Sequence, residues 1–388
     1  MGAPTHTSYR LDWIRAQFEI TKRDLTYLNH AGLSPLPTRS RDAMNQLSAA
    51  LATEGDQAFG EHFESLVHGL LDNIQKMVNA SHDEITLVQN TSTGINLIAH
   101  SLPLHAGDEV LVCNLEFPSN VYPFMNMASK GVVTRIVEAR EGGLTVEAIK
   151  SGLSAQTRMV VVSALQFFSG RQEDLHTIGA FCKERGLWLI VDATQAAGLM
   201  PLDMQVMHID ALVSGGQKAL MGPPGIGFMA IRQALLEQMT PIFASAISVE
   251  GWEHWLQYDF KLQPMIRAYD NSTPNLIGMA GLRASMDLLL EIGVSAINEW
   301  VSHLSDLAIE ELDRQGFQVI TPHLHANIVT FAWSGDAKAA AEALKAEGVM
   351  LRPHFDATGN GYLRLSSHCY NTEADIISFG KALEKITP

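Results

Sequence analysis

The chain has few cysteines and little positive charge, and both shortages exclude whole classes of protein. Only three cysteines occur among 388 residues, at irregular spacing and without a Cys-x-x-Cys pair. Such a set argues against a disulfide framework or a zinc ribbon and favours a reducing, cytoplasmic setting. The 27 basic residues are outnumbered by 42 acidic ones, and the formal net charge is −15 with no basic run. We therefore expect no nucleic-acid partner and no anionic membrane partner.

Long apolar runs are also missing. No stretch approaches the roughly 20 apolar residues that span a bilayer, and residues 1–15 lack the basic start and apolar run of a secretion signal. Membrane insertion and secretion are therefore not expected. What is present is an ordinary globular composition, 46% hydrophobic and 18% charged. At roughly 150 residues per domain, the length predicts two domains, with three as the alternative.

The middle of the chain predicts an α/β domain. Short apolar runs recur at residues 109–115, 158–165, 187–193, 211–215 and 225–231. They lack polar alternation, which is typical of strands buried on both faces of a largely parallel sheet. Residues 173–186 carry apolar side chains at helical spacing and end on Gly186, a helix stop signal. Ligands of such sheets lie at the carboxyl ends of the strands, so residues that follow each run are the first candidates for chemistry.

The rest of the chain predicts a second, smaller unit. Long amphipathic helices after about residue 281 are followed by strand-like segments at 326–333 and 361–366, a pattern typical of an α+β domain. Residues 241–275, rich in aromatic, proline and polar residues, predict an irregular connection or an interface. We divide the chain into an N-terminal arm that packs with the small domain (1–25), a large domain (26–275) and a small C-terminal domain (276–388).

Polar residues follow two of the predicted strands. Lys218 stands between an apolar strand and a glycine-proline turn, where partial burial would lower the pKa of its amine toward nucleophilicity. A surface loop lysine is the alternative. Asp192 ends the most apolar run, and a buried carboxylate needs a partner such as a cationic ring nitrogen. Gln195 is placed to present its amide to the same ligand, whereas a helix cap is the other interpretation of Asp192.

In order and spacing, Asp192, Gln195 and Lys218 resemble the pyridoxal phosphate site of the class V aminotransferase family, which includes cysteine desulfurases, kynureninase and isopenicillin N epimerase-like members. The resemblance implies an α/β fold of fold-type I, with a mainly parallel central sheet in the large domain and a smaller α+β C-terminal domain. It implies that Lys218 forms the Schiff base with pyridoxal 5'-phosphate, that Asp192 pairs with the pyridinium nitrogen and that Gln195 contacts the ring hydroxyl. Ser214 and Gln217 are placed beside the cofactor as well.

The resemblance implies that two further segments bind the phosphate of that cofactor. Residues 87–99 resemble the family's phosphate-binding turn, with Thr91, Ser92 and Thr93 at a helix N-terminus where backbone N–H groups and the helix dipole favour a phosphate. A plain capping box is the alternative. Thr273 resembles the threonine that a neighbouring subunit offers to the same phosphate. This implies a homodimer with the active site at the subunit interface.

Phe117 and Ala164 depart from the family pattern, whereas Gln166 fits it. Phe117 follows Glu116, where many relatives place a histidine that stacks on the cofactor ring. A phenylalanine can stack on the pyridine ring but cannot move a proton, and a core phenylalanine is the alternative. Gln166 lies where relatives often carry an asparagine or glutamine near the cofactor hydroxyl, and Ala164 replaces a frequent histidine.

Near the C-terminus, Arg364 resembles the family's anchor for the substrate α-carboxylate, which a planar guanidinium suits. A surface salt bridge is the alternative. Arg352 and His354 lie on the adjacent loop, where they contact the substrate side chain or are merely solvated. We place Asn29 among the substrate-binding residues as well, and we expect no metal site.

The resemblance implies an enzyme that acts on a small amino acid, with the freed amine of Lys218 as the base for the Cα proton. Transamination, epimerisation and β-elimination then stay open. Cysteine desulfurases carry a nucleophilic cysteine on the loop before the carboxylate-binding arginine, and the matching residues 353–361 contain none. We therefore expect an aminotransferase or a C–S or other β-lyase without a persulfide cysteine. An amino-acid epimerase, a cysteine desulfurase-like sulfur donor and a non-catalytic cofactor-binding regulator or scaffold are the alternatives.

Overall fold

The computed structural model describes residues 9–271 and 273–387. Its centre is a seven-stranded sheet in the order β2-β8-β7-β6-β5-β3-β4. These strands are β2 (Ile85–Val88), β3 (Glu109–Cys113), β4 (Val133–Val137), β5 (Thr157–Ser163), β6 (Trp188–Asp192), β7 (Ala211–Gly215) and β8 (Gly227–Ile231). The pairings from β4 through β7 are parallel, and β8 is antiparallel to both of its neighbours. The mainly parallel sheet of the α/β prediction is therefore confirmed.

Each predicted apolar run overlaps one strand, and the side chains of these strands are almost all buried. Along β6, Leu189 and Val191 join the apolar core on one face of the sheet, while Ile190 joins the core on the other face. Burial on both faces explains why these runs show no polar alternation. The edge strand β4 was not predicted, because its side chains are mostly exposed or half-buried and its sequence is correspondingly mixed.

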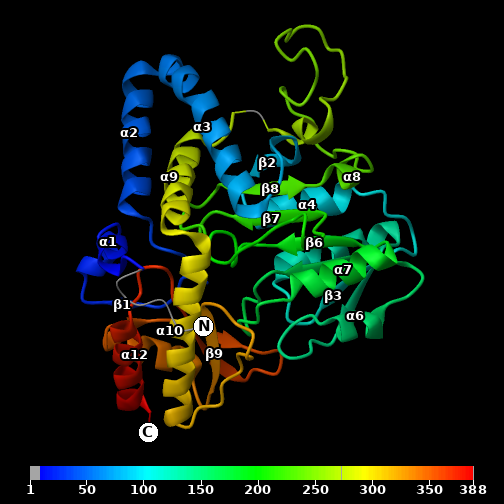
Figure 1. The fold of residues 1–388 in the computed structure, drawn as a ribbon. Coiled ribbons are helices and arrows are strands. Elements are labelled where there is room, and N and C mark those ends of the chain that lie inside the picture. The colour runs from blue at the N-terminus through cyan, green and yellow to red at the C-terminus, as the bar shows by residue number, and fades with distance from the viewer. Residues whose placement is uncertain (1–8, 272, 388) are drawn as a thin grey trace.

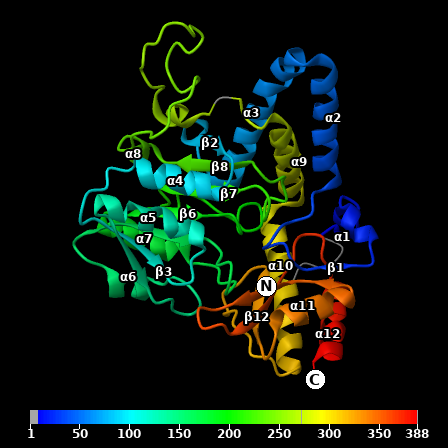
Figure 2. The same cartoon turned by 180° about the vertical axis from the view of Figure 1, so that it is seen from behind.

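Helices cover both faces of this sheet. On one face pack α4 (Thr91–Ser101), α5 (Tyr122–Asn126) and α8 (Gln233–Leu236). On the other pack α3 (Asp56–Val78), α6 (Val146–Gly152) and α7 (Leu175–Arg185). Figure 1 shows α7 in front of the sheet, and Figure 2 shows α4 and α5 in front of it from behind. The predicted helix at 173–186 is thus confirmed as α7, which ends at Gly186 in the left-handed conformation.

The C-terminal part forms a separate layer below the large sheet (Figure 1). The long helix α9 (Leu276–Ile292) still packs against α3 at the level of the large sheet (Figure 1). It meets α10 (Val294–Arg314), the first helix of the lower layer, at Gly293, whose φ of 97° suits glycine. A three-stranded antiparallel sheet follows, in the order β11-β12-β9, built from β9 (Ile328–Trp333), β11 (Arg352–Phe355) and β12 (Gly361–Ser366). The helices α11 (Ala337–Ala346) and α12 (Glu373–Ile386) complete this α+β layer.

The N-terminal segment packs against the C-terminal layer. The short strand β1 (Thr26–Tyr27) pairs in parallel with β10 (Val349–Met350). Before it come α1 (Leu11–Arg15) and the 3-10 helix η1 (Glu19–Lys22). The Tyr9 hydroxyl donates to the carbonyl of Cys369 at 3.1 Å, and Arg15 donates to the carbonyl of Tyr370 at 2.9 Å. Residues 1–8 of the predicted arm lie outside the described residues, and the domain boundaries stay a prediction.

The remaining elements join these parts. The helix α2 (Thr38–Glu54) lies beside α3 and α9 (Figure 1). Short 3-10 helices are η2 (His82–Glu84), η3 (Pro118–Asn120), η4 (Met127–Lys130) and η5 (Met265–Tyr269). The described residues of the irregular segment 241–275 form mostly loop, as predicted, and this loop projects at the top of Figure 1. Over residues 9–271 and 273–387, the structure has no helix with the length and hydrophobicity needed to cross a membrane.

Candidate active site

A cavity of about 420 Å³ opens beyond the carboxyl ends of β6 and β7. It lies where the sheet architecture predicts a ligand. Most of the predicted site residues line it: Asn29, Thr91, Ser92, Phe117, Asp192, Gln195, Gln217, Lys218, Arg352, His354 and Arg364. They come from the large sheet, from the N-terminal segment and from the C-terminal strands, so the cavity requires all three parts of the chain.

Lys218 and Asp192 supply the charges at the base of the cavity. Burial lowers the pKa of the Lys218 amine to about 8, although Asp192 opposes this effect. Burial raises the pKa of Asp192, against the bond that its Oδ1 accepts from the Thr194 N–H at 2.9 Å. An amine with a pKa near neutrality is partly unprotonated, and the unprotonated amine is the nucleophile and the base. The alternative of a solvated surface lysine is therefore wrong.

The N-terminus of α4 faces the same cavity. Asn90 caps the helix by accepting the Thr93 N–H at 2.9 Å. Thr91 shares a hydrogen bond of 2.6 Å with Thr194, and Ser92 shares one of 2.7 Å with Ser119. Backbone N–H groups and hydroxyls at a helix N-terminus form a site for a phosphate. Thr93 is an exception to the prediction, because it does not line the cavity and its hydroxyl lies 3.3 Å from the cap oxygen of Asn90.

Phe117 forms an aromatic wall of the cavity. The Lys218 ammonium lies 5.0 Å from the centre of its ring. Phe117 is 37% exposed and meets the ring of Phe167 edge-on at 5.1 Å. The alternative of a core phenylalanine is therefore wrong, and a ring in this position can stack on a planar ligand.

The cationic side of the cavity comes from the hairpin of β11 and β12. Arg364 is 3% exposed, and its Nη1 donates to the carbonyl of Phe167 at 2.7 Å. Burial and the neighbouring Arg352 lower the pKa of Arg364 to about 9. Burial, together with the nearby Arg364, Arg352 and Lys218, lowers the pKa of His354 to about 3, so its ring is neutral. Arg364 is a buried cavity residue, and the surface salt bridge alternative is wrong.

Two residues from other segments complete the lining. The Gln195 amide donates to the carbonyl of Ala31 at 3.0 Å. The backbone of Asn29 pairs with Ser366 at the end of β12, and its Oδ1 is buried without a hydrogen-bond partner among the described residues. These contacts fix the loop after β1 against both the large sheet and the C-terminal layer.

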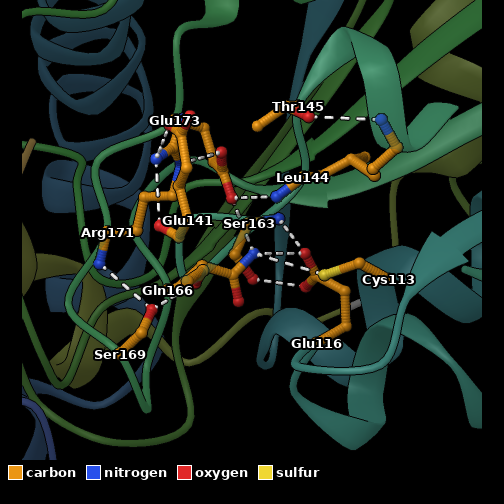
Figure 3. A network of polar contacts seen from close by, with 12 residues as sticks. Cys113, Glu116, Glu141, Leu144, Thr145, Ser163, Gln166, Ser169, Arg171 and Glu173 are labelled. Atoms are coloured by element: carbon orange, nitrogen blue, oxygen red, sulfur yellow. Dashed lines mark hydrogen bonds and ion pairs between the residues drawn. The ribbon is translucent and has the colours of Figure 1, made fainter. Parts of the chain in front are cut away.

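Gln166 does not line the cavity, contrary to the sequence prediction. Its side chain is fully buried, and its Nε2 donates to Glu116 at 2.7 Å and to Glu173 at 3.1 Å (Figure 3). Two buried carboxyl groups attract the amide inward, because each needs a donor to offset the loss of water. Ser214 is also turned away, since it is fully buried in β7 and its hydroxyl donates to the carbonyl of Gly215 at 3.2 Å.

Thr273 lies apart from this cavity as well. It lines a second cavity of about 390 Å³, together with residues of α3, β2 and the loop before α9. A residue that serves the site of a second subunit is expected to lie outside its own subunit's site. The role of Thr273 therefore stays a prediction.

A buried polar network behind the cavity was not predicted from the sequence. Ser163, which lines the cavity, donates to Glu116 through its hydroxyl at 2.6 Å and through its backbone N–H at 2.9 Å. Asn120 donates to the same carboxyl group at 2.8 Å. Burial raises the pKa of Glu116. Glu116 thus ties β5 to the loop that carries Phe117, and its position directly before Phe117 was the only signal in the sequence.

Glu173 extends this network away from the cavity (Figure 3). It accepts the Leu144 N–H at 2.8 Å and pairs with Arg171 at 3.1 Å. Burial raises the pKa of Glu173 to about 7. Figure 3 places Gln166 between the carboxyl groups of Glu116 and Glu173, so one amide links both acids.

The family follows from a comparison with known proteins. The aminotransferase class-V family model matches residues 26–379 of the chain. The chain belongs to the class V aminotransferase family.

Curated relatives of this class V enzyme are named for sulfur chemistry. A probable cysteine desulfurase of Methanothermobacter thermautotrophicus is 28% identical, over 94% of this chain and 95% of the relative. A probable cysteine desulfurase of Halalkalibacterium halodurans is 26% identical, over 95% and 94%. Among solved structures, a cysteine desulfurase of Escherichia coli has a TM-score of 0.87 at 23% identity, over 97% of this chain and 98% of the other. That structure supports the fold-type I architecture.

Pyridoxal phosphate is the cofactor of this class V enzyme, and the cavity residues fit it. The buried Asp192 suits a cationic ring nitrogen, the N-terminus of α4 suits the phosphate, and the amine of Lys218 suits a covalent link. Phe117 offers a face for stacking. When bound, the cofactor supplies an electron sink for the bonds at the substrate Cα. Over the described residues, no cluster of three histidine, cysteine or acidic side chains suits a metal ion.

Proposed function

We propose that this class V enzyme is a lyase that cleaves the C–S bond of a cysteine-type amino acid without forming an enzyme persulfide. Relatives named cysteine desulfurase, matched over nearly the whole chain, support sulfur chemistry. They favour the desulfurase-like alternative over the aminotransferase that headed the sequence prediction. Neither of these two relatives is named as an epimerase or as a non-catalytic scaffold.

The position of the cysteines is the observation that carries the second half of the proposal. Cys113, Cys182 and Cys369 are all buried, and none of them lines the cavity. Burial raises the pKa of all three thiols, that of Cys182 to about 12. Persulfide formation requires an accessible thiolate that attacks the departing sulfur. Without one, the sulfur leaves the site as sulfide or as a small thiol.

The cavity residues divide the remaining work. Arg364 holds the substrate α-carboxylate, because a buried guanidinium without a described acidic partner gains most from a bound anion. Lys218 takes the Cα proton, since its pKa of about 8 makes the amine an effective base. Phe117 cannot compete for that proton. The hairpin residues and the wall at Phe117 hold the substrate between them.

The proposed β-elimination needs no oxidant or reductant. The C–S bond breaks, and the sulfur leaves with the bonding pair while Lys218 accepts the Cα proton. The carbon product is 2-aminoacrylate, which water converts to pyruvate and ammonium. A desulfurase would instead yield alanine and leave the sulfur on an acceptor thiol.

Product analysis tests the proposal. The holoenzyme is incubated with L-cysteine and with an S-substituted cysteine, and pyruvate, ammonium, alanine and released sulfide or thiol are measured. The expected result is pyruvate, ammonium and sulfur product in equal amounts, with no change in the mass of the protein. Alanine accompanied by one added sulfur atom on the enzyme would refute the proposal in favour of a desulfurase. A keto acid that forms only when an amino acceptor is present would instead indicate an aminotransferase.

We also propose a homodimer in which Thr273 of each subunit serves the site of the other. In support, Thr273 lines the second cavity and not the cavity at the α4 N-terminus. The family resemblance predicts that Thr273 binds the phosphate at such a helix N-terminus, so it would have to do this in the other subunit. Mixing a Lys218→Ala chain with a Thr273→Val chain should restore one intact site per mixed dimer, and absence of any recovery in mixed dimers would contradict the arrangement. The cytoplasmic setting stays a prediction from the cysteine content.

A further inference from the structure

We propose that the cavity selects cysteine S-conjugates whose substituent ends in an anionic group, and that Arg352 recognises this group. The inference rests on the proposed function, because it names the substrate class of the same site. The strand register brings two arginines of the cavity together.

Arg352 and Arg364 are direct cross-strand partners in the antiparallel pair of β11 and β12. Like charges directly opposite one another destabilise a sheet. Neither guanidinium forms a salt bridge with an acidic side chain of residues 9–271 and 273–387. An arrangement of this kind is stabilised when negative charge enters the cavity, and a single carboxylate neutralises only one of the two cations.

The charges of the cavity leave Arg352 without an anion. Asp192 is the one acidic residue among the described residues that line the cavity, and it lies at the end of β6 beside Lys218. The phosphate site is at the α4 N-terminus, on different elements from the hairpin. Arg364 takes the α-carboxylate. A substrate with one negative charge therefore leaves Arg352 unpaired, whereas a substrate with a second anionic group pairs it.

The exposures of the two arginines indicate where that second group lies. Arg364 is 3% exposed, while Arg352 is exposed although it lines the same cavity. The α-carboxylate thus binds deep and the second anion binds near the mouth. The side chain of cysteine itself carries no carboxylate, sulfinate or sulfonate group, so a substrate that pairs both arginines is an S-substituted cysteine.

His354 adds a polar contact on the same strand. It stands two residues from Arg352 on β11, so both side chains point to one face of the hairpin. Its ring is held edge-on by Phe167 at 6.0 Å and by Phe168 at 6.2 Å. The Nε2 atom is buried and has no hydrogen-bond partner among the described residues. A neutral ring beside a guanidinium suits an oxygen of a carboxylate, sulfinate or sulfonate group.

Two matched substrates test the charge preference. S-Carboxymethyl-L-cysteine and S-carbamoylmethyl-L-cysteine have nearly the same size and differ in one negative charge. Elimination releases thioglycolate from the first and its amide from the second, with pyruvate and ammonium in both cases. Because a charge-assisted hydrogen bond is stronger than a neutral one, we expect kcat/KM to be at least about tenfold higher for the charged conjugate.

Three variants assign that preference to a residue. Arg352→Met should remove the preference by lowering kcat/KM for the charged conjugate more than for the neutral one. Arg364→Met should lower kcat/KM for both conjugates. Lys338→Met is the control for general electrostatics, since Lys338 lies over the ring of Phe355 at 5.5 Å and does not line the cavity. It should leave the preference unchanged, and circular dichroism checks that each variant is folded.

The outcomes separate this inference from the proposed function. Equal losses on both conjugates in Arg352→Met would show that Arg352 assists the α-carboxylate or the departing sulfur, and would overturn the inference. So would a wild-type enzyme without a charge preference. If neither conjugate releases a thiol, the lyase proposal fails, and binding of the same conjugates is then measured from the absorbance change of the bound cofactor. Tighter binding of the charged conjugate, lost in Arg352→Met, would still support the inference.

Discussion

Replacement of all three cysteines by alanine tests the absence of a persulfide step most directly. We expect the variant Cys113→Ala, Cys182→Ala, Cys369→Ala to keep its turnover with L-cysteine and with S-conjugates. None of these side chains lines the cavity, so no group that touches the substrate is removed. The cost should fall on stability alone.

The size of that cost follows from burial. The three side chains are at most 1% exposed. Removing each sulfur leaves a small hole and costs about 1 kcal/mol, so the triple variant loses about 3 kcal/mol. Cys369 packs its Sγ at 3.9 Å from the Met221 sulfur, and Cys113 lies at 4.0 Å from the Gln166 amide. Typical domains have 5–15 kcal/mol of stability, so the variant should fold.

The assay measures the free energy of unfolding by urea denaturation beside kcat/KM for sulfide release. The single variant Cys182→Ala, on α7, is the matched control for packing. Turnover within about twofold of wild type in a folded triple variant is the expected result. Loss of sulfide release in a folded variant, together with one added sulfur atom on the wild-type protein after reaction, would refute the reasoning and restore the desulfurase interpretation.

Three further predictions address single residues. Lys218→Ala should abolish the covalent link to the cofactor, and peptide mapping after borohydride reduction of the wild type should find the label on Lys218; a label on another lysine would contradict its role. Asp192→Ala should retain cofactor through the phosphate site but lower kcat at least about 100-fold, measured at saturating substrate; near-normal turnover would exclude its assignment. Arg171→Met should destabilise the fold by about 3 kcal/mol at pH 8 and by clearly less at pH 5 in urea titrations. The pKa of Glu173 is raised from 4.5 to about 7, so the stabilising contribution of this carboxyl group falls as the pH rises from 4.5 to 7. Above pH 7 the carboxyl group is ionised and needs the charge of Arg171. A cost independent of pH would refute the role of this ion pair.

Much of the fold was predictable because the pattern that marks its buried strands is local in the sequence. Strands that are buried on both faces must be continuously apolar, so the runs that became β3, β5, β6, β7 and β8 could be recognised one by one. The edge strand β4 could not be recognised, since its side chains face solvent and carry no such constraint. The pairing of β1 with β10 was also hidden, because two strands of two residues each have no pattern of their own.

The candidate site divides in the same way. The sequence by itself determined that Asp192 ends one buried strand, that Lys218 follows another and that Thr91 begins a helix, because each placement depends on neighbouring residues. Only the tertiary structure decided that Gln166 turns inward, since its amide is drawn to Glu116, which lies 50 residues earlier, and to Glu173 across the same loop. Only the register of β11 and β12 decided that Arg352 faces Arg364. Contacts of this kind depend on how the chain folds back on itself, and a pattern of residue types along one segment contains no information about them.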